Sequence, residues 1–556
     1  MKKILLSAIL LIASLSLSAQ QYPEKLPVDS AVRVGHLDNG LTYYIRHNEQ
    51  PKQRCEFHIA QRVGAILEED NQNGLAHFLE HMAFNGTQHF PGKGIIDYFE
   101  SIGVNFGGNI NAYTAIDETV YRLSDVPTTR EGIIDSALLV MHDWACGLNL
   151  EADEIDAERG VIREEWRTRF NAGFRMYTEY LKQCYPGSQY AKRNVIGDTA
   201  VINNFTYDAL RAYYKKWYGP DNQAIVVVGD IDVDQIEAKI KSLWADVPAR
   251  VNRGERPYYS VDNNKEPIVA VITDKEATGT SIELVCKHEK LPEELIGTAP
   301  EYMLNLMHSL ISQMMSERFN DIRLKADAPI HSGGIGYGEM VKGKDAFQAS
   351  VSAKEGRETE AYNLLLNELE RMSRFGFTNG EFQRAKANTL TSYERSYNER
   401  NTRQNITLTR EYIRNYLDQE AIPGIELEYE MVRQALELLP IQKLNELAKS
   451  YITDENVILT IFAPEKESVK IPTKEKILAM FNDRSHFGVL PLAEENPNVS
   501  LVKKAPHAGK IVSEKHNEEL GTTEWVLKNG IKVVILPTEW KKDEISLRAF
   551  SQGGHS

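Results

Sequence analysis

The order of apolar and polar positions predicts alternating strands and helices over the first 230 residues. Asn39-Gly40 separates two short apolar runs and is a dipeptide typical of a tight hairpin turn. Strands, alternating or continuously apolar, are predicted at 32–45, 54–63, 119–123 and 223–229. Helices, the last strongly charged, are predicted at 74–84, 129–144 and 152–170. This mixture predicts an α+β fold with helices packed on mainly antiparallel sheets.

A second unit of the same kind follows. It begins near Pro267 with an apolar strand and closes with the strand VILTIFAP at 457–464. Long amphipathic helices are predicted between them at 301–321 and 358–375. The next 40 residues are richer in Pro, Gly, Lys and Glu and lack sustained periodicity, which is typical of a linker. The predicted boundaries are 20–262 for a first domain, 263–481 for a second and 482–521 for the linker.

The end of the chain repeats its beginning. The stretch 525–554 echoes 35–64, within Arg33 to Gly64, without a gap and at a constant offset of 490 residues. Identical residues at this offset are Asn39 and Asn529, Gly40 and Gly530, Ile45 and Ile535, and Gly64 and Gly554. A register held through a hairpin and the next strand indicates a duplicated unit. We therefore expect 522–556 to be the truncated start of a third domain, and the chain to be the front portion of a longer protein with two halves.

Residues 1–19 predict a signal peptide. Lys2 and Lys3 form a basic start, an apolar stretch covers 4–17, and Ala19 ends a cleavage site. The alternative is a membrane anchor, but the stretch is short and interrupted by serines, whereas a span needs about 20 apolar residues. No other segment has that character. We expect a periplasmic or secreted protein, after signal peptide removal, with no stable membrane insertion.

The charge of the chain excludes one class of partner. Its formal net charge at pH 7 is −15, and its pI is about 5.5. Binding to nucleic acid depends largely on basic surfaces that neutralise phosphates. An acidic chain of this kind is therefore not expected to bind nucleic acid.

The strongest chemical signal is the sequence GLAHFLEHM at 74–82. On a helix, His77 and His81 lie one turn apart on the same face, with Glu80 beside them. Two imidazoles so placed can bind one zinc ion, and the adjacent carboxylate can hold and deprotonate a water. This HxxEH order is the inverse of HExxH and is a recognised peptidase signature. A chance pair of histidines would not explain why an otherwise apolar helix aligns them with a glutamate.

A third ligand is expected from another segment, because catalytic zinc usually has three protein ligands. The charged helix at 152–170 offers Glu158 and Glu165, which are seven residues apart and share a face. They are also about 10 Å apart along the helix axis, which is too far for both to bind one ion. One would be the ligand and the other would orient a histidine or the ligand itself. Spacing leaves their assignment open, and it does not exclude a solvated charged helix.

These motifs resemble those of the pitrilysin, or M16, family of metallopeptidases. GLAHFLEHMAFNGT is similar to the family's metal helix, and ERGVIREEW is similar to its third-ligand helix. NAYT at 111–114 and WYGPDNQAIVVVGDID at 217–232 also match in kind and order. The resemblance implies a zinc site with His77, His81 and Glu165 as ligands. It also implies Glu80 as the general base and Glu158 as the supporting acid of the metal site.

The resemblance has further implications for substrate binding and architecture. Asn111 and Ala112 would lie on an edge strand that pairs with the substrate backbone, a form of β-augmentation. Family members form a clamshell of two homologous halves around a chamber that admits peptides or unfolded segments. Each half contains repeated domains, and this chain would hold the first half.

The leading hypothesis is a zinc-dependent endopeptidase that hydrolyses peptides or unfolded polypeptide segments, with one zinc ion per catalytic domain. Its expected partners are the substrate and a second M16 half from the same longer chain; a homodimer is left open. The rival hypothesis is a non-catalytic M16-like subunit that binds peptides, although such members usually lose motif residues that are present here. A peptidase that matures a precursor would share the chemistry and differ only in substrate.

Overall fold

The structure is a computed structural model that describes residues 23–245, 247–249, 255–494, 502, 504–539 and 544–554. The predicted signal peptide lies outside these residues. The chain divides into one unit that ends at Ala493 and another that begins at Glu494. The first unit contains two sheets with their helices, and the second contains a three-stranded sheet. Within the described ranges, no helix combines the length and apolar character that crossing a bilayer requires.

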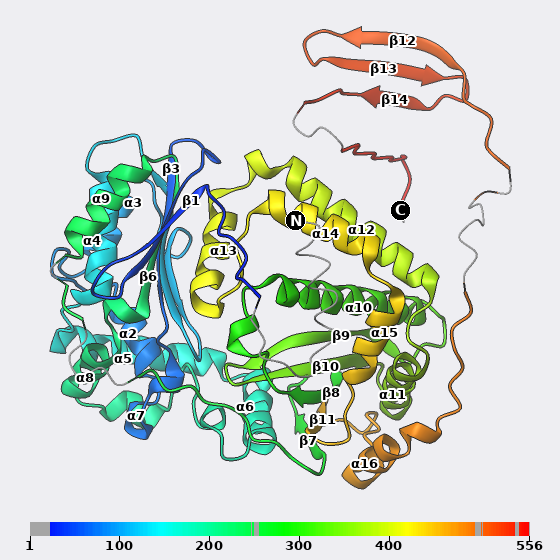
Figure 1. Cartoon of the computed structure of the whole chain (residues 1–556), viewed down its shortest axis with the longest axis horizontal. Coiled ribbons are helices and arrows are strands. Elements are labelled where there is room, and N and C mark those ends of the chain that lie inside the picture. The colour runs from blue at the N-terminus through cyan, green and yellow to red at the C-terminus, as the bar shows by residue number, and fades with distance from the viewer. Residues whose placement is uncertain are drawn as a thin grey trace. The chain divides into compact units, whose positions relative to one another are not determined.

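The first sheet has six strands in the order β1-β2-β6-β3-β5-β4 (Figure 1). Their bounds are Val32–His36 (β1), Thr42–His47 (β2), Arg54–Gln61 (β3), Ile110–Thr114 (β4), Thr119–Pro127 (β5) and Gln223–Gly229 (β6). Neighbouring strands are antiparallel except β2 and β6, which run parallel. All seven residues of β6 are buried, which explains why its sequence is continuously apolar rather than alternating.

Helices cover both faces of this sheet. Between residues 23 and 245, the helices that the structure describes are α2 (Leu75–Met82), α3 (Gly94–Glu100), α4 (Ile133–Cys146), α5 (Ala152–Arg169), α6 (Ala172–Cys184), α7 (Thr199–Asn204), α8 (Tyr207–Trp217) and α9 (Val233–Leu243). On one face, Ile225 and Val227 of β6 belong to the core that α2 and α4 complete. On the other face, Val226 and Val228 pack with Leu408 of a helix from much later in the chain, α13 (Asn405–Asp418).

The second sheet has five strands in the order β7-β11-β8-β10-β9. Their bounds are Ile268–Asp274 (β7), Thr280–His288 (β8), Ile330–Val341 (β9), Lys344–Ala353 (β10) and Val457–Pro464 (β11). β7 and β11 run parallel and the other neighbours are antiparallel. The remaining helices are α10 (Ala299–Arg323), α11 (Glu358–Phe375), α12 (Asn379–Asn398), α14 (Ile425–Leu438), α15 (Ile441–Ser450) and α16 (Lys474–Asn482).

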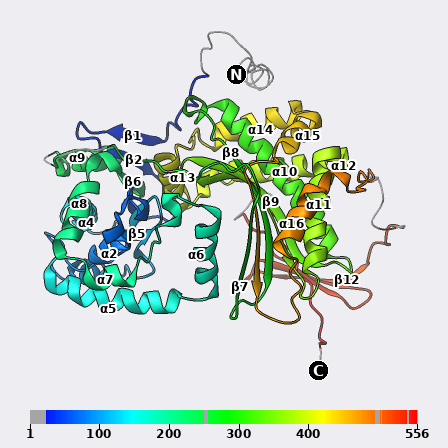
Figure 2. The same ribbon diagram turned by 90° about the horizontal axis from the view of Figure 1, so that it is seen from below.

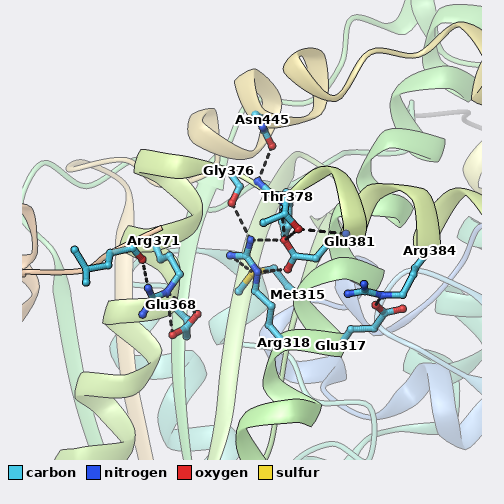
Figure 3. A network of polar contacts seen from close by, with 12 residues as sticks. Met315, Glu317, Arg318, Glu368, Arg371, Gly376, Thr378, Glu381, Arg384 and Asn445 are labelled. Atoms are coloured by element: carbon cyan, nitrogen blue, oxygen red, sulfur yellow. Dashed lines mark hydrogen bonds and ion pairs between the residues drawn. The ribbon is translucent and has the colours of Figure 1, made fainter. Parts of the chain in front are cut away.

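A buried ion pair joins α10 to the start of α12 (Figure 3). The Arg318 side chain donates to both carboxylate oxygens of Glu381 at 2.5 and 2.9 Å, and also to the backbone oxygen of Gly376 at 2.8 Å. Glu381 also accepts from the backbone N–H and the hydroxyl of Thr378, which completes a capping box. The guanidinium lies 4.5 Å from the centre of the Phe377 ring. The charge of Arg318 is therefore fully compensated inside the helical layer.

The three-stranded sheet of the second unit has the order β12-β13-β14, with bounds Ile511–Asn517, Thr522–Leu527 and Lys532–Ile535. β12 lies inside the segment 482–521 that the sequence predicted to be a linker. Hydrophobic periodicity did not predict this strand, because the strand is largely exposed and polar. Its pairing with β13 depends on backbone hydrogen bonds.

The predicted hairpin turn occurs in both copies with the same geometry. Gly40 donates its N–H to Leu37 at 2.9 Å, and Gly530 donates to Leu527 at 2.8 Å. Both glycines have positive φ, 97° and 87°, as such turns require. The Asn39 side chain accepts from the N–H two residues later at 3.2 Å, and Asn529 at the offset of 490 does the same at 3.2 Å.

Candidate metal centre

The helix α2 is held at its start by a carboxylate from the segment just before it. It begins after Gly74, which has a φ of 105° and no side chain that could cap the helix. Instead, Glu68 accepts hydrogen bonds from the N–H groups of Gly74 at 2.9 Å and Ala76 at 2.7 Å. Burial raises the pKa of Glu68 to about 8. These two bonds satisfy donors that a helix start otherwise leaves unpaired, and they fix the position of the following turn.

The buried side of α2 determines which residues face outward. Its apolar residues pack into the core of the first domain, and these are Leu75, Phe78, Leu79 and Met82. The motif residues therefore face α5, which lies beside α2 (Figure 2). This is the arrangement that the helical spacing predicted.

Three potential ligand atoms meet between α2 and α5. The Nε2 atoms of His77 and His81 lie 3.6 and 3.3 Å from Oε2 of Glu165. All three atoms lie within 4.8 Å of one another. Two imidazole nitrogens and one carboxylate form a ligand set typical of catalytic zinc, so the residues present fit the metal that the sequence predicted. The carboxylate oxygen that lies near both Nε2 atoms belongs to Glu165 and not to Glu158.

Glu158 instead contacts the outer nitrogen of a histidine. Its Oε1 lies 2.8 Å from Nδ1 of His81, and its Oε2 accepts a hydrogen bond from the Asn85 side chain at 2.6 Å. Burial opposes ionisation of Glu158, but the hydrogen bonds from His81 and Asn85 together with the charge of His81 outweigh it, so the pKa of Glu158 is lowered. An Nδ1–H that donates to this carboxylate leaves Nε2 of His81 free as a metal ligand.

Glu80 is held on the same side of the helix by β4. Oε2 of Glu80 accepts a hydrogen bond from the hydroxyl of Thr114 at 2.6 Å. Burial raises the pKa of Glu80, and the Thr114 hydrogen bond opposes that effect. A carboxylate with a raised pKa is a stronger base than an exposed one, which suits proton transfer.

The two histidines have opposite electrostatic surroundings. Burial, with the neighbouring charge of His81, lowers the pKa of His77 to about 4. Burial also disfavours the charged form of His81, but its hydrogen bonds with Glu158 and Glu165 prevail and raise its pKa to about 9. The cluster therefore favours a positive charge at His81, and a bound cation would satisfy the same carboxylates.

The predicted substrate-binding residues lie on the edge of the first sheet. In the described sheet, β4 is the last strand and has β5 as its single neighbour. The Asn111 side chain donates to the backbone oxygen of Gly107 at 2.8 Å and accepts from the N–H of Ala112 at 2.8 Å. The sheet edge at Ala112 is therefore covered by the side chain of the preceding residue. The same strand carries Thr114 to Glu80, so this edge runs beside the metal centre.

Three residues of this site were absent from the sequence prediction. Asn85 follows His81 by one helical turn, a spacing that could have marked it. Thr114 belongs to the NAYT motif, in which the prediction considered only the first two residues. Glu68 lies outside every motif, and its role depends on the local turn that brings its carboxylate to the N–H groups at the start of α2.

Two family models match the chain. Residues 43–182 match the model described as insulinase (peptidase family M16). Residues 204–389 match the model described as peptidase M16 inactive domain. Together the two models cover more than half of the sequence. The chain belongs to peptidase family M16. Its predicted membership and its α+β architecture with two M16-type domains are thereby confirmed.

Individual M16 relatives are named zinc proteases. A zinc protease PQQL-like protein of Arabidopsis thaliana is 28% identical over 524 residues, which cover 94% of this chain and 51% of that protein. The probable zinc protease PqqL of Escherichia coli (strain K12) is 28% identical over 548 residues, covering 98% and 58%. The chain thus spans little more than half the length of these relatives.

A solved M16 structure has the same fold. The crystal structure of the first half of the periplasmic protease PqqL from Escherichia coli matches 85% of this chain and 100% of its own, with a TM-score of 0.78 and 27% identity. The chain therefore has the architecture of the first half of a two-half M16 protease. The roles of individual site residues and the domain boundaries remain predictions.

Proposed function

We propose that this chain is the catalytic first half of a zinc endopeptidase that hydrolyses peptides or unfolded polypeptide segments. The observation that carries this proposal is the meeting of His77, His81 and Glu165 in a zinc-type ligand set, with Glu80 beside it. The names of the relatives, which include zinc proteases, support the same reaction class.

The chemistry divides between the metal and Glu80. Zinc held by the two histidines and Glu165 would polarise the scissile carbonyl. Glu80 takes a proton from the attacking water and passes it to the leaving amine. The hydroxyl of Thr114 holds Oε2 of Glu80, which leaves Oε1 available for the proton. Glu158 keeps the His81 ring oriented, and Asn85 keeps Glu158 in place.

The edge strand β4 aligns the substrate. A peptide that adds to this edge would replace the Asn111 side chain at the N–H of Ala112 with its own carbonyl. Such pairing recognises the backbone of the substrate and therefore tolerates many substrate sequences. A second M16 half from the same longer chain would supply the rest of the chamber, and the periplasm is the expected location by analogy with the relative from Escherichia coli.

The test combines metal content and turnover for the same variants, expressed from the full-length gene. We expect Glu80→Gln to retain zinc and lose turnover by about 10²- to 10⁴-fold, because it removes the base alone. His77→Ala should lose both zinc and activity. An active Glu80→Gln enzyme would contradict the mechanism, and a folded wild type without zinc would favour the non-catalytic peptide-binding subunit.

A further inference from the structure

A cavity in the second domain shares no lining residue with the metal centre. Its volume is about 610 Å³, which is within the range of small-molecule sites. Residues of α10, α12, α13 and α14 line it together with Gly336 and Tyr337 of β9; Figure 1 labels these elements. An adjoining hollow of about 580 Å³ shares Tyr393, Glu411, Ile425 and Glu428 with it, so these residues stand between the two spaces.

The cavity contains more carboxylates than cations. Of the acidic groups on its wall, Glu411 pairs with Arg403, and Glu420 pairs with Arg414 at 2.7 Å. Among the residues that the structure describes, no cation lies within ion-pair distance of Glu428, and no hydrogen bond to its carboxylate is present. Burial, followed by the charge of Glu411, raises the pKa of Glu428 to about 7, although the more remote charges of Arg403 and Arg414 act in the opposite direction. A half-buried carboxylate without a counter-ion is costly, and a cationic ligand would remove that cost.

His308 presents a second polar group to the same space. It is only 7% exposed, and its ring stacks on Tyr337 with centroids 4.1 Å apart. Its Nδ1 lies 2.5 Å from the hydroxyl of Tyr451, a residue outside the cavity lining. When the neutral ring carries its hydrogen on Nδ1 and donates it to Tyr451, Nε2 is the acceptor nitrogen, and within the described chain Nε2 has no hydrogen-bond partner. Burial lowers the pKa of His308 to about 4, so the neutral ring can accept a hydrogen bond there.

Aromatic rings complete the wall. Tyr302 and Tyr393 contribute rings from α10 and α12, and their hydroxyls lie 3.2 Å apart. Tyrosine faces attract cations and also cover the apolar carbons that carry them. The wall thus combines an unpaired carboxylate, a buried acceptor nitrogen and apolar ring surface.

We propose that this cavity binds an alkylammonium group, either a lysine side chain of a polypeptide or a free aliphatic amine. The ammonium donates to Glu428 and to Nε2 of His308, while the alkyl stem lies against Tyr302 and Tyr393. The carboxylate supplies the charge and the rings supply apolar contact, so a neutral alcohol of the same length lacks the main attraction. The inference is independent of the reaction at the metal centre.

The test uses cadaverine as the probe in calorimetric titrations of the chain at low salt. We expect Glu428→Gln to raise the dissociation constant at least about tenfold, as the loss of a charged hydrogen bond predicts. The matched control is Glu426→Gln on the same helix, whose carboxylate is exposed and pairs with Arg400 at 3.1 Å outside the cavity. It should leave binding unchanged. Tyr393→Leu should weaken binding several-fold while every carboxylate remains.

Competition separates the two sources of the amine. Displacement of cadaverine by an Nα-acetylated lysine amide, but not by its Nε-acetylated form, identifies a polypeptide side chain. Binding of cadaverine without such displacement identifies a free amine. Equal affinities for 1-pentanol and cadaverine, equal losses in Glu428→Gln and Glu426→Gln, or no cadaverine binding by folded wild type would overturn the proposal.

Discussion

The two sheets of the first unit share one topology and differ in chemistry. The strands β2-β6-β3-β5-β4 and β7-β11-β8-β10-β9 have the same order, each with one parallel pair at the same place. In each, the second strand along the chain is followed by a helix before the next strand, α2 in one case and α10 in the other. The comparison is therefore between two helices in equivalent positions.

α2 and α10 use their polar residues for different purposes. α2 presents His77, Glu80 and His81 to α5 and β4, which gives the candidate metal centre. α10 places Arg318 in a buried ion pair and His308 on a cavity wall. From β7 onward, the described residues contain no cluster of three potential metal ligands. One fold thus carries a candidate metal centre in one domain and a buried ion pair beside a cavity in the other.

The largest expected effect is a loss of stability in the second domain, which contains α10 and α12. Arg318→Met leaves the carboxylate of Glu381 buried without its cation, which should cost about 3–5 kcal/mol of unfolding free energy. Urea unfolding followed by circular dichroism measures it. Zinc affinity should not change, because this ion pair does not contact the metal centre.

A neighbouring ion pair provides the control for that measurement. Arg384 and Glu317 join the same two helices at 3.4 Å, but Arg384 is 44% exposed (Figure 3). Arg384→Met should therefore cost about 1 kcal/mol or less. Equal losses in the two variants would show that the network around Arg318 has no special stabilising role.

A smaller effect is expected in the first domain when a hydrogen bond that supports the metal centre is removed. Asn85→Ala removes the hydrogen bond that holds Oε2 of Glu158, and Glu158 in turn orients His81. We expect zinc affinity to fall about 10- to 100-fold, as for other residues that orient metal ligands. Competition with a chromogenic chelator measures it.

Asn204 is a suitable control for Asn85. It is exposed at the end of α7, and its side chain donates to the backbone oxygen of Ala200. Asn204→Ala should leave zinc affinity unchanged. If Asn85→Ala also leaves zinc affinity unchanged while Glu158→Gln lowers it, Glu158 orients His81 without any contribution from Asn85.

The two domains also show which features can be predicted from a sequence. The metal helix could be predicted because the ligand spacing and the apolar core face occur within nine residues. β6 and the hairpin at Asn39-Gly40 could be predicted because their signals are local. Glu68 could not, because its role depends on the conformation of the turn between it and α2, which no motif marks. The cavity beside Glu428 likewise depends on how α10 and β9 pack against the later helices α12, α13 and α14.

The smallest expected effect is on the number of protons that the chain releases when it binds zinc. It depends on the pKa of His81, which differs strongly from that of His308. In the metal-free chain the pKa of His81 is raised to about 9, whereas that of His308 is lowered to about 4. The protonated form of His81 therefore stabilises the metal-free fold fully below its unfolded pKa of about 6.5, and this contribution disappears as the pH rises through about 9.

Zinc must displace the proton of His81, so binding at pH 7 should release about one proton, and this release should fall toward zero above pH 9. Calorimetry in two buffers with different ionisation enthalpies measures it. Glu158→Gln removes the hydrogen bond that raises the pKa of His81, so the release at pH 7 should decrease in that variant. His308→Gln should leave it unchanged, because the neutral ring of His308 has no proton to exchange at this pH. A release that is the same in Glu158→Gln as in wild type would place the exchanging proton on a residue other than His81.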